Sequence, residues 1–176
     1  MKLHIGGTTP HPDWKILDIE ARPEVDYIGD ANDLSQFEDE SIEAIYASHV
    51  LEHFYYRLYD ELIFTLAEWY RVLKPEGKLM ISVPDLFTLC SLYLTPHLTV
   101  DDRFILMTAI FGGQLNPYDV HKVGFDEEIL AIYLRDVGFE SYQRVEEFEL
   151  FSDSSSLRVM GHLISLNMIA YKTCPT

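Results

Sequence analysis

Short apolar runs that end in polar residues alternate along this 176-residue chain with segments of helical periodicity. Ile42–Ala47 is the clearest run, and a nearly continuous apolar run is typical of a strand buried on both faces of a parallel sheet. Similar runs at Lys2–Ile5, Trp14–Ile19, Asp26–Gly29 and Lys78–Val83 predict four more strands. Because ligands bind at the carboxyl ends of such strands, the polar residues that follow these runs are candidate site residues.

Four segments show the spacing of helices. Apolar residues recur every three or four positions from Leu58 to Leu73, which predicts one helix that Pro75 ends. Three further helices are predicted at Leu86–Leu94, Asp101–Phe111 and Asp126–Val137. The glycines and acidic residues at their ends are typical helix caps.

The last two predicted strands, Phe139–Leu150 and Ser165–Tyr171, follow one another without a helix. Strands and helices that alternate and then end in such a pair predict an α/β fold with a Rossmann-like, seven-stranded sheet. We expect this sheet to be mostly parallel, with an antiparallel strand at one edge. No repeat or long linker divides the chain, so residues 1–176 should form a single domain, with 86–125 as a helical insertion or lid.

The connections early in the chain are unusually short. Only eight residues, 6–13, join the first two strands, and about six, 20–25, join the next two. A parallel crossover usually needs a dozen residues and contains a helix, so these two helices should be missing or minimal. The apolar face of the first three strands then needs another cover. We expect a second subunit rather than the 86–125 helices, and hence a homodimer.

Charge and composition narrow the possible partners. The chain has 29 acidic residues against 13 lysines and arginines, a formal net charge of −16. Such a charge repels nucleic acid but is compatible with a small cationic ligand. No apolar run is long enough to span a membrane, and Cys90 and Cys174 suggest no disulfide framework. Nothing at the N-terminus resembles a signal peptide, so we expect a cytoplasmic protein.

Polar residues follow four of the predicted strands in a recognisable order. Gly6 and Gly7 follow the first strand, Asp18 ends the second, Asp30-Ala31 follows the third, and Ser48-His49 follows the fourth. Together with the HVLEH and LKPEGKLMISVPD stretches, this order resembles the class I S-adenosylmethionine-dependent methyltransferases. The resemblance is to the type 11, ubiquinone-biosynthesis-like group, with a shortened N-terminal half.

The resemblance implies a cofactor, S-adenosylmethionine, with S-adenosylhomocysteine as product. It places Gly6 and Gly7 beside the methionine part, together with the backbone of Ser48 and His49. It also implies that Asp18 holds the ribose hydroxyls and that Asp30 and Ala31 hold the adenine. Each residue also has a simpler explanation, as a turn glycine, a solvated acid or a helix cap.

The glycine motif departs from the family pattern at two positions. His4 stands where an acid is more common, and Thr8 stands where a second glycine is expected. These departures and the missing helices favour an alternative in which the fold persists as a catalytically inactive interaction module. Otherwise the resemblance implies methyl transfer to a small-molecule acceptor that the sequence does not identify.

His49–His53 also matches H-x-x-E-H, a zinc-binding pattern of some hydrolases. That pattern needs both histidines on one face of a helix, whereas His49 directly follows a strand. We therefore expect no metal and rank a zinc hydrolase as the third alternative. Three residues are candidates for a general base, His49, Asp85 and His121, although a cap or a loop hydrogen bond explains the last two equally well.

Overall fold

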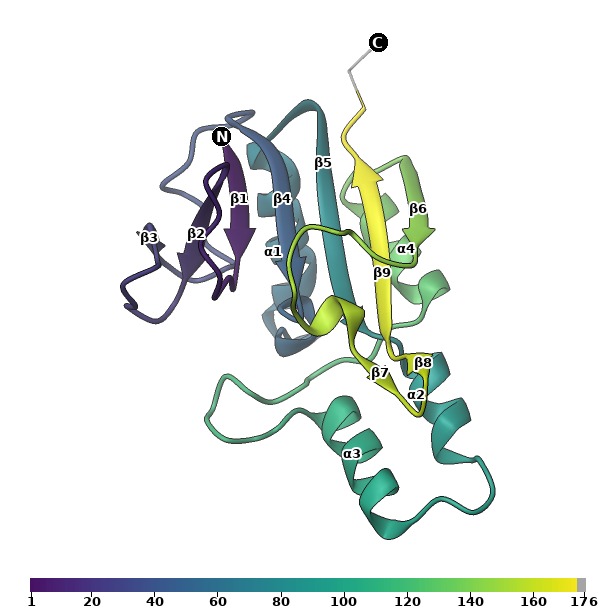
Figure 1. Ribbon diagram of the computed structural model, residues 1–176. Coiled ribbons are helices and arrows are strands. Elements are labelled where there is room, and N and C mark those ends of the chain that lie inside the picture. The colour runs from purple at the N-terminus through teal and green to yellow at the C-terminus, as the bar shows by residue number, and fades with distance from the viewer. Residues whose placement is uncertain (174–176) are drawn as a thin grey trace.

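The computed structural model describes residues 1–173, so Cys174 lies outside the described residues. Seven strands form one sheet in the order β3-β2-β1-β4-β5-β9-β6 (Figure 1). All neighbouring pairs are parallel except those of β9, which runs antiparallel to both β5 and β6. The strands are β1 (Lys2–Ile5), β2 (Trp14–Asp18), β3 (Tyr27–Ile28), β4 (Ile42–Ser48), β5 (Leu73–Pro84), β6 (Ser141–Val145) and β9 (Ser165–Tyr171). The predicted fold class is confirmed, and the antiparallel strand is the second from the β6 edge.

The predicted helices are present within a few residues of their expected ends. They are α1 (Glu61–Val72), α2 (Leu86–Tyr93), α3 (Val100–Phe111) and α4 (Glu127–Asp136). Three short 3-10 turns and a small hairpin complete the elements, and η2 lies at the start of the predicted first helix: η1 (Leu51–His53), η2 (Leu58–Asp60), η3 (Ser154–Ser156), β7 (Arg158–Val159) and β8 (His162–Leu163). No helix among residues 1–173 is long and apolar enough to cross a membrane.

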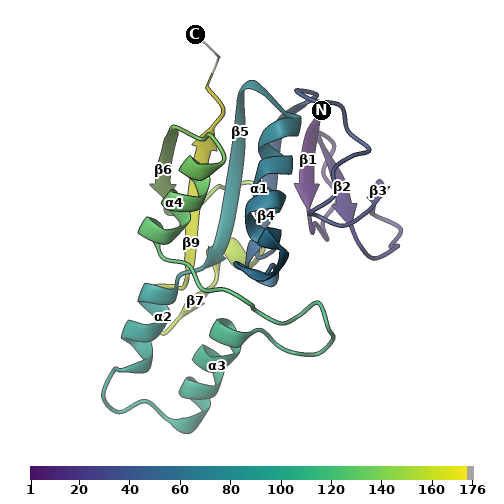
Figure 2. The ribbon, with the colours of Figure 1, turned by 180° about the vertical axis from the view of Figure 1, so that it is seen from behind.

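The two faces of the sheet are covered differently. Helices α1 and α4 pack on one face, as Figure 2 shows from behind. On the other face the segment 146–157, which contains no α-helix, crosses over β9, β5 and β4 (Figure 1). Its side chains Phe148, Leu150 and Phe151 pack on a buried cluster that includes Trp14 and Tyr46.

The predicted absence of two crossover helices is confirmed: no helix joins β1 to β2 or β2 to β3. The expectation that a second subunit covers the first three strands is wrong, however. Leu3 and Leu17 are already buried within a single chain, and Phe151 stacks on His4 with ring centroids 4.2 Å apart. Neither a second subunit nor α2 and α3 is needed there, and these two helices lie beyond the carboxyl ends of β4 and β5 (Figure 1).

The segment 146–157 was expected to continue a strand as far as Leu150. Instead β6 ends at Val145, and Glu149 adopts a positive φ of 54°, which turns the chain back over the sheet. The apolar spacing of Phe148 and Leu150 suits a strand and a covering loop equally well, so the pattern alone could not distinguish them.

Candidate functional site

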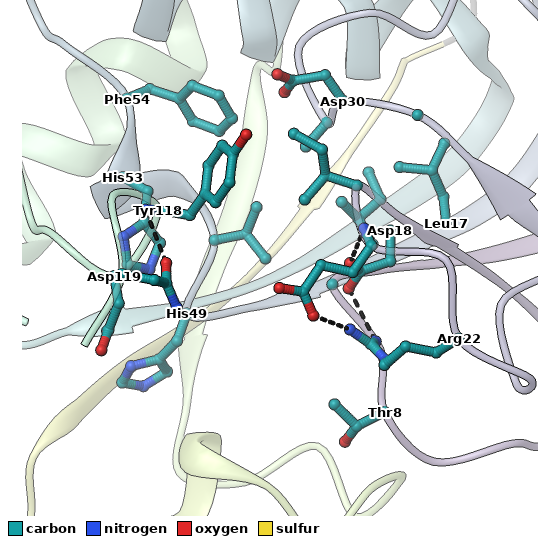
Figure 3. A pocket seen from close by; sticks show the side chains of 18 of the residues that line it. Thr8, Leu17, Asp18, Arg22, Asp30, His49, His53, Phe54, Tyr118 and Asp119 are labelled. Carbon is teal, nitrogen blue, oxygen red and sulfur yellow. Dashed lines mark hydrogen bonds and ion pairs between the residues drawn. The ribbon is translucent and has the colours of Figure 1, made fainter. Parts of the chain in front are cut away.

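A pocket of about 600 Å³ lies at the carboxyl ends of β1, β2, β3 and β4. Figure 3 shows its residues on two opposite sides. One side, the strand-end wall, is lined by Ile5, Gly6, Thr8, Leu17, Asp18, Ile19, Glu20, Arg22, Gly29, Asp30 and Ala31. The other, the loop wall, is lined by His49, Val50, His53, Phe54, Asn116, Tyr118, Asp119 and Lys122, and Glu61 lines the pocket as well. A volume of this size is within the usual range for sites of small ligands and cofactors.

The backbone of the strand-end wall depends on Gly6. Its φ is +71°, its N–H donates to Leu17 O at 2.9 Å, and a Cβ there would lie 2.8 Å from Val50 Cγ2. Glycine is therefore required both for the turn and for the open floor of the pocket. Gly7 does not line the pocket; a Cβ on it would lie 2.6 Å from the ring of His4.

Asp18 ends β2 and lines the same wall. Its Oδ1 accepts from Glu20 N–H at 2.8 Å, and its Oδ2 accepts from Arg22 Nη2 at 3.0 Å (Figure 3). Arg22 also donates to Gly7 O at 2.8 Å. One arginine therefore joins the glycine loop to the end of β2, where a crossover helix is missing.

Asp30 and Ala31 line the far end of this wall, just after β3. Asp30 Oδ1 accepts from Asn32 N–H at 3.2 Å, and Ala31 O accepts from the Trp69 indole at 2.8 Å. Trp69 is fully buried in α1, so the helix fixes the position of this short turn. Asp18, Asp30, Ala31 and Gly6, chosen from separate strand ends, therefore lie at one pocket.

The loop wall begins at His49, whose φ of 56° marks a sharp turn after β4. Its Nε2 lies 3.0 Å from Ser165 Oγ and its Nδ1 lies 3.3 Å from Glu52 Oε1. Lys122 N–H donates to Glu52 O at 2.8 Å, which attaches the loop after α3 to η1. Tyr118 on this loop thereby comes to line the pocket opposite Asp18 (Figure 3).

Behind this wall lies a buried carboxylate. Glu52 is 0% exposed, with His49, His53 and His121 close by. Burial alone would raise the pKa of the Glu52 carboxyl, but the imidazoles, His49 first, outweigh burial and hold it below its usual value. Burial lowers the pKa of His121, although the charge of Glu52 opposes this shift.

Besides Gly7, three of the residues chosen from the sequence lie outside the pocket lining. Asp85 caps α2 and is held by Thr88 Oγ1 at 2.9 Å and by Arg144 Nη2 at 2.8 Å. This arrangement favours the cap over the general base. Ser48 does not reach the pocket, and His121 lies behind it, with its ring centroid 5.0 Å from that of His53.

Several lining residues had no counterpart in the sequence analysis: Glu20, Arg22, Phe54, Glu61, Asn116, Tyr118, Asp119 and Lys122. Arg22 could have been suspected as one of only 13 basic residues, placed four positions after Asp18. The loop residues carry no local signal, because they reach the pocket through the hydrogen bonds of Val120 and Lys122 to η1, which lies far away in the sequence.

Comparison with known proteins agrees with this arrangement. Residues 15–81 match the model of a family described as a methyltransferase domain. The chain has the class I methyltransferase fold. The family resemblance inferred from the sequence is thus confirmed. No curated protein sequence matches the chain.

Solved methyltransferases share this fold at low sequence identity. The CurJ carbon methyltransferase is 20% identical with a TM-score of 0.58, and the alignment covers 98% of this chain but 48% of that one. A methyltransferase from Archaeoglobus fulgidus, described as SAM-dependent, is 16% identical, with coverages of 97% and 85% and a TM-score of 0.58.

A third structure carries ligands. The 1,6-didemethyltoxoflavin-N1-methyltransferase of Burkholderia thailandensis, solved with 1,6-didemethyltoxoflavin and S-adenosylhomocysteine, is 18% identical. The alignment covers 98% of this chain and 71% of that one, with a TM-score of 0.58. This methyltransferase-fold chain spans about half the length of the CurJ enzyme, and identities this low establish the fold alone.

Proposed function

We propose that the chain transfers a methyl group from S-adenosylmethionine to a small-molecule acceptor in this pocket. One observation carries the proposal: Gly6, Asp18 and Asp30 follow three different strands and line a single cavity on a methyltransferase fold. A group of chance surface acids would not be expected at the matching ends of β2 and β3.

The strand-end wall suits the parts of the cofactor. An ionised carboxylate accepts about four hydrogen bonds, and Asp18 uses two, so it can also accept from the ribose hydroxyls. Asp30 would accept from the exocyclic amine of the adenine, next to Ala31. The open floor at Gly6 and the turn at His49 would hold the methionine part.

The acceptor would then bind against the loop wall. Methyl transfer needs the nucleophile close to the sulfonium methyl and in line with it, so positioning is the main task of the protein. Residues 86–125, the predicted insertion or lid, contribute Tyr118 and Lys122 to this side. Of the three predicted base candidates only His49 lines the cavity, but its ring nitrogens lie 3.0 Å from Ser165 Oγ and 3.3 Å from Glu52 Oε1, so we assign no general base.

The proposal keeps the cytoplasmic location and the homodimer predicted from the sequence, but it moves the contact between subunits. Apolar side chains are exposed on and near α2 and α3, among them Phe87, Leu94 and Phe104, at 72%, 81% and 63%. Exposed apolar side chains in such number are unusual on a monomer. Light scattering at micromolar concentration should give the mass of two chains.

Calorimetry with S-adenosylhomocysteine tests the proposed function without an identified acceptor. We expect one site per chain with micromolar to sub-millimolar affinity. Asp30→Ala should weaken binding by about 1–3 kcal/mol, since a ligand donor loses its acceptor. Asp33→Ala is the matched control, because Asp33 lies nearby in the chain but does not line the pocket.

The non-catalytic alternative makes the opposite prediction. The ion pair between Arg22 and Asp18 and the glycine loop without a following helix are the features that favour it. If the alternative holds, millimolar S-adenosylhomocysteine will produce neither heat nor a shift in melting temperature.

A further inference from the structure

The group of ionisable side chains behind the loop wall is not accounted for by methyl transfer. Glu52, His53 and His121 each bring one nitrogen or oxygen atom within 4.8 Å of the other two. Glu52 is fully buried, and neither of its carboxylate oxygens has a hydrogen-bond partner among the described residues. A buried carboxylate without partners is costly unless a cation compensates its charge.

The hydrogen bonds of the two histidines fix which nitrogen carries the proton. His53 Nδ1 lies 3.2 Å from Val120 O, and His121 Nδ1 lies 3.3 Å from Ile110 O. A carbonyl oxygen can only accept, so each Nδ1 is the donor. Each Nε2 of a neutral ring is left with a lone pair, and His121 Nε2 is 3.9 Å from Glu52 Oε1. A lone pair of His121 thus faces a carboxylate oxygen of Glu52 with no hydrogen between them.

His49 does not resolve this conflict. Ser165 Oγ donates its hydrogen to Ser154 O at 2.7 Å, so His49 Nε2 must donate to Ser165 Oγ. The Nδ1 of a neutral His49 then presents another lone pair, 3.3 Å from Glu52 Oε1. Protonation of His49 would supply one positive charge near Oε1 but would leave the lone pairs of the other two histidines unmatched.

We propose that Glu52, His53 and His121 bind one divalent transition-metal ion, with zinc as the best fit. Two imidazoles and a carboxylate are a common ligand set for zinc, and ligating histidines usually donate their second N–H to a carbonyl or carboxylate. Tetrahedral ligands about 2.0–2.1 Å from zinc lie roughly 3.4 Å apart. The three side chains therefore need to close by at most about 1.5 Å from the separations seen here.

The proposed site differs from the zinc pattern considered from the sequence. His49 is not a ligand, and the third ligand, His121, comes from the loop after α3. The expectation that HVLEH binds no metal assumed that both histidines of the motif had to share one helix face. Since His53 lines the pocket, the ion would lie at the pocket wall, where a water or an acceptor oxygen can complete its coordination.

Metal binding by the untagged 176-residue chain tests this proposal without any methyl-transfer assay. After dialysis against a chelator, titration with zinc chloride should give one site per chain, and cobalt should give the intense visible absorption of a tetrahedral complex. His53→Ala, His121→Ala and Glu52→Gln should each weaken zinc binding by more than about 100-fold. His97→Asn removes an exposed histidine outside the cluster and should leave binding unchanged.

Two results would overturn the proposal. One is a wild-type chain that takes up no zinc and no cobalt, as expected if a protonated His49 alone balances Glu52. The other is zinc binding of wild-type strength in a folded His121→Ala variant, checked by circular dichroism. Calorimetry of the zinc-free chain with S-adenosylhomocysteine reports separately on the proposed function, so the two failures remain distinguishable.

Discussion

The two walls of the pocket are built by different means. The strand-end wall consists of residues that directly follow β1, β2 and β3, and its charged side chains have partners, as Asp18 does in Arg22. The loop wall is joined from two segments far apart in the sequence, and it conceals a carboxylate without hydrogen-bond partners, Glu52. Strand ends thus supply fixed positions for binding, whereas the loops bring together groups of unbalanced charge, where chemistry or metal binding is expected.

The largest expected effect is on the pH dependence of folding stability, and it comes from His4, which lies beneath the strand-end wall against Phe151. Burial lowers the pKa of His4 from 6.5 to about 4, although Asp153 opposes the shift. Between pH 6.5 and 4 the unfolded chain binds a proton that the folded chain does not. Stability should therefore fall by about 3 kcal/mol as the pH decreases through this window, and this loss should level off below pH 4.

Urea unfolding at pH 7 and pH 4.5, repeated with His4→Phe, isolates this contribution. Phenylalanine keeps the aromatic contact and cannot titrate, so between these two pH values the variant should lose about 2 kcal/mol less than the wild type. Acidic groups elsewhere contribute equally to both proteins. Equal losses in the two would mean that His4 is protonated as readily in the folded chain as in the unfolded one.

Replacing Gly6, which shapes the strand-end wall, should have an intermediate effect on the free energy of unfolding. Gly6→Ala should lower the free energy of unfolding by about 1–2 kcal/mol, because alanine disfavours the left-handed backbone at this position. The contact of the new Cβ with Val50 should lower it further. Gly161→Ala provides the control, since Gly161 has a φ of +80° and nothing within 4 Å of its Cβ position. The difference between the two variants in urea unfolding measures the contact with Val50, and no difference would contradict it.

Replacing Arg22 should have the smallest effect on stability. Its ion pair with Asp18 is partly exposed, at 26% and 12% for the two side chains, so Arg22→Ala should cost less than about 1 kcal/mol of stability. Affinity for S-adenosylhomocysteine should fall less than about tenfold, because Asp18 remains but loses its orientation. Arg158→Ala removes an equally charged side chain outside the pocket and should leave affinity unchanged. A tighter complex in Arg22→Ala would show that Arg22 competes with the ligand.

The same contrast explains what could be predicted from the sequence. Gly6, Asp18 and Asp30 were identified because each follows an apolar run, and the topology of a parallel sheet brings those ends together. The approach of His121 to Glu52 was not predicted, since it depends on the hydrogen bonds that Val120 and Lys122 make with η1, far away in the sequence. The loop over the other face of the sheet was mistaken for a strand, because the positive φ of Glu149 leaves no mark on the apolar pattern.

A crystal structure of the chain with S-adenosylhomocysteine would show whether the cofactor binds against the strand-end wall. We expect the adenine amine within hydrogen-bond distance of Asp30 and the ribose hydroxyls within hydrogen-bond distance of Asp18. The methionine part should pass over Gly6, and the sulfur should face the loop wall. Ligand bound elsewhere on the chain, or a strand-end wall that stays empty at millimolar ligand, would contradict it.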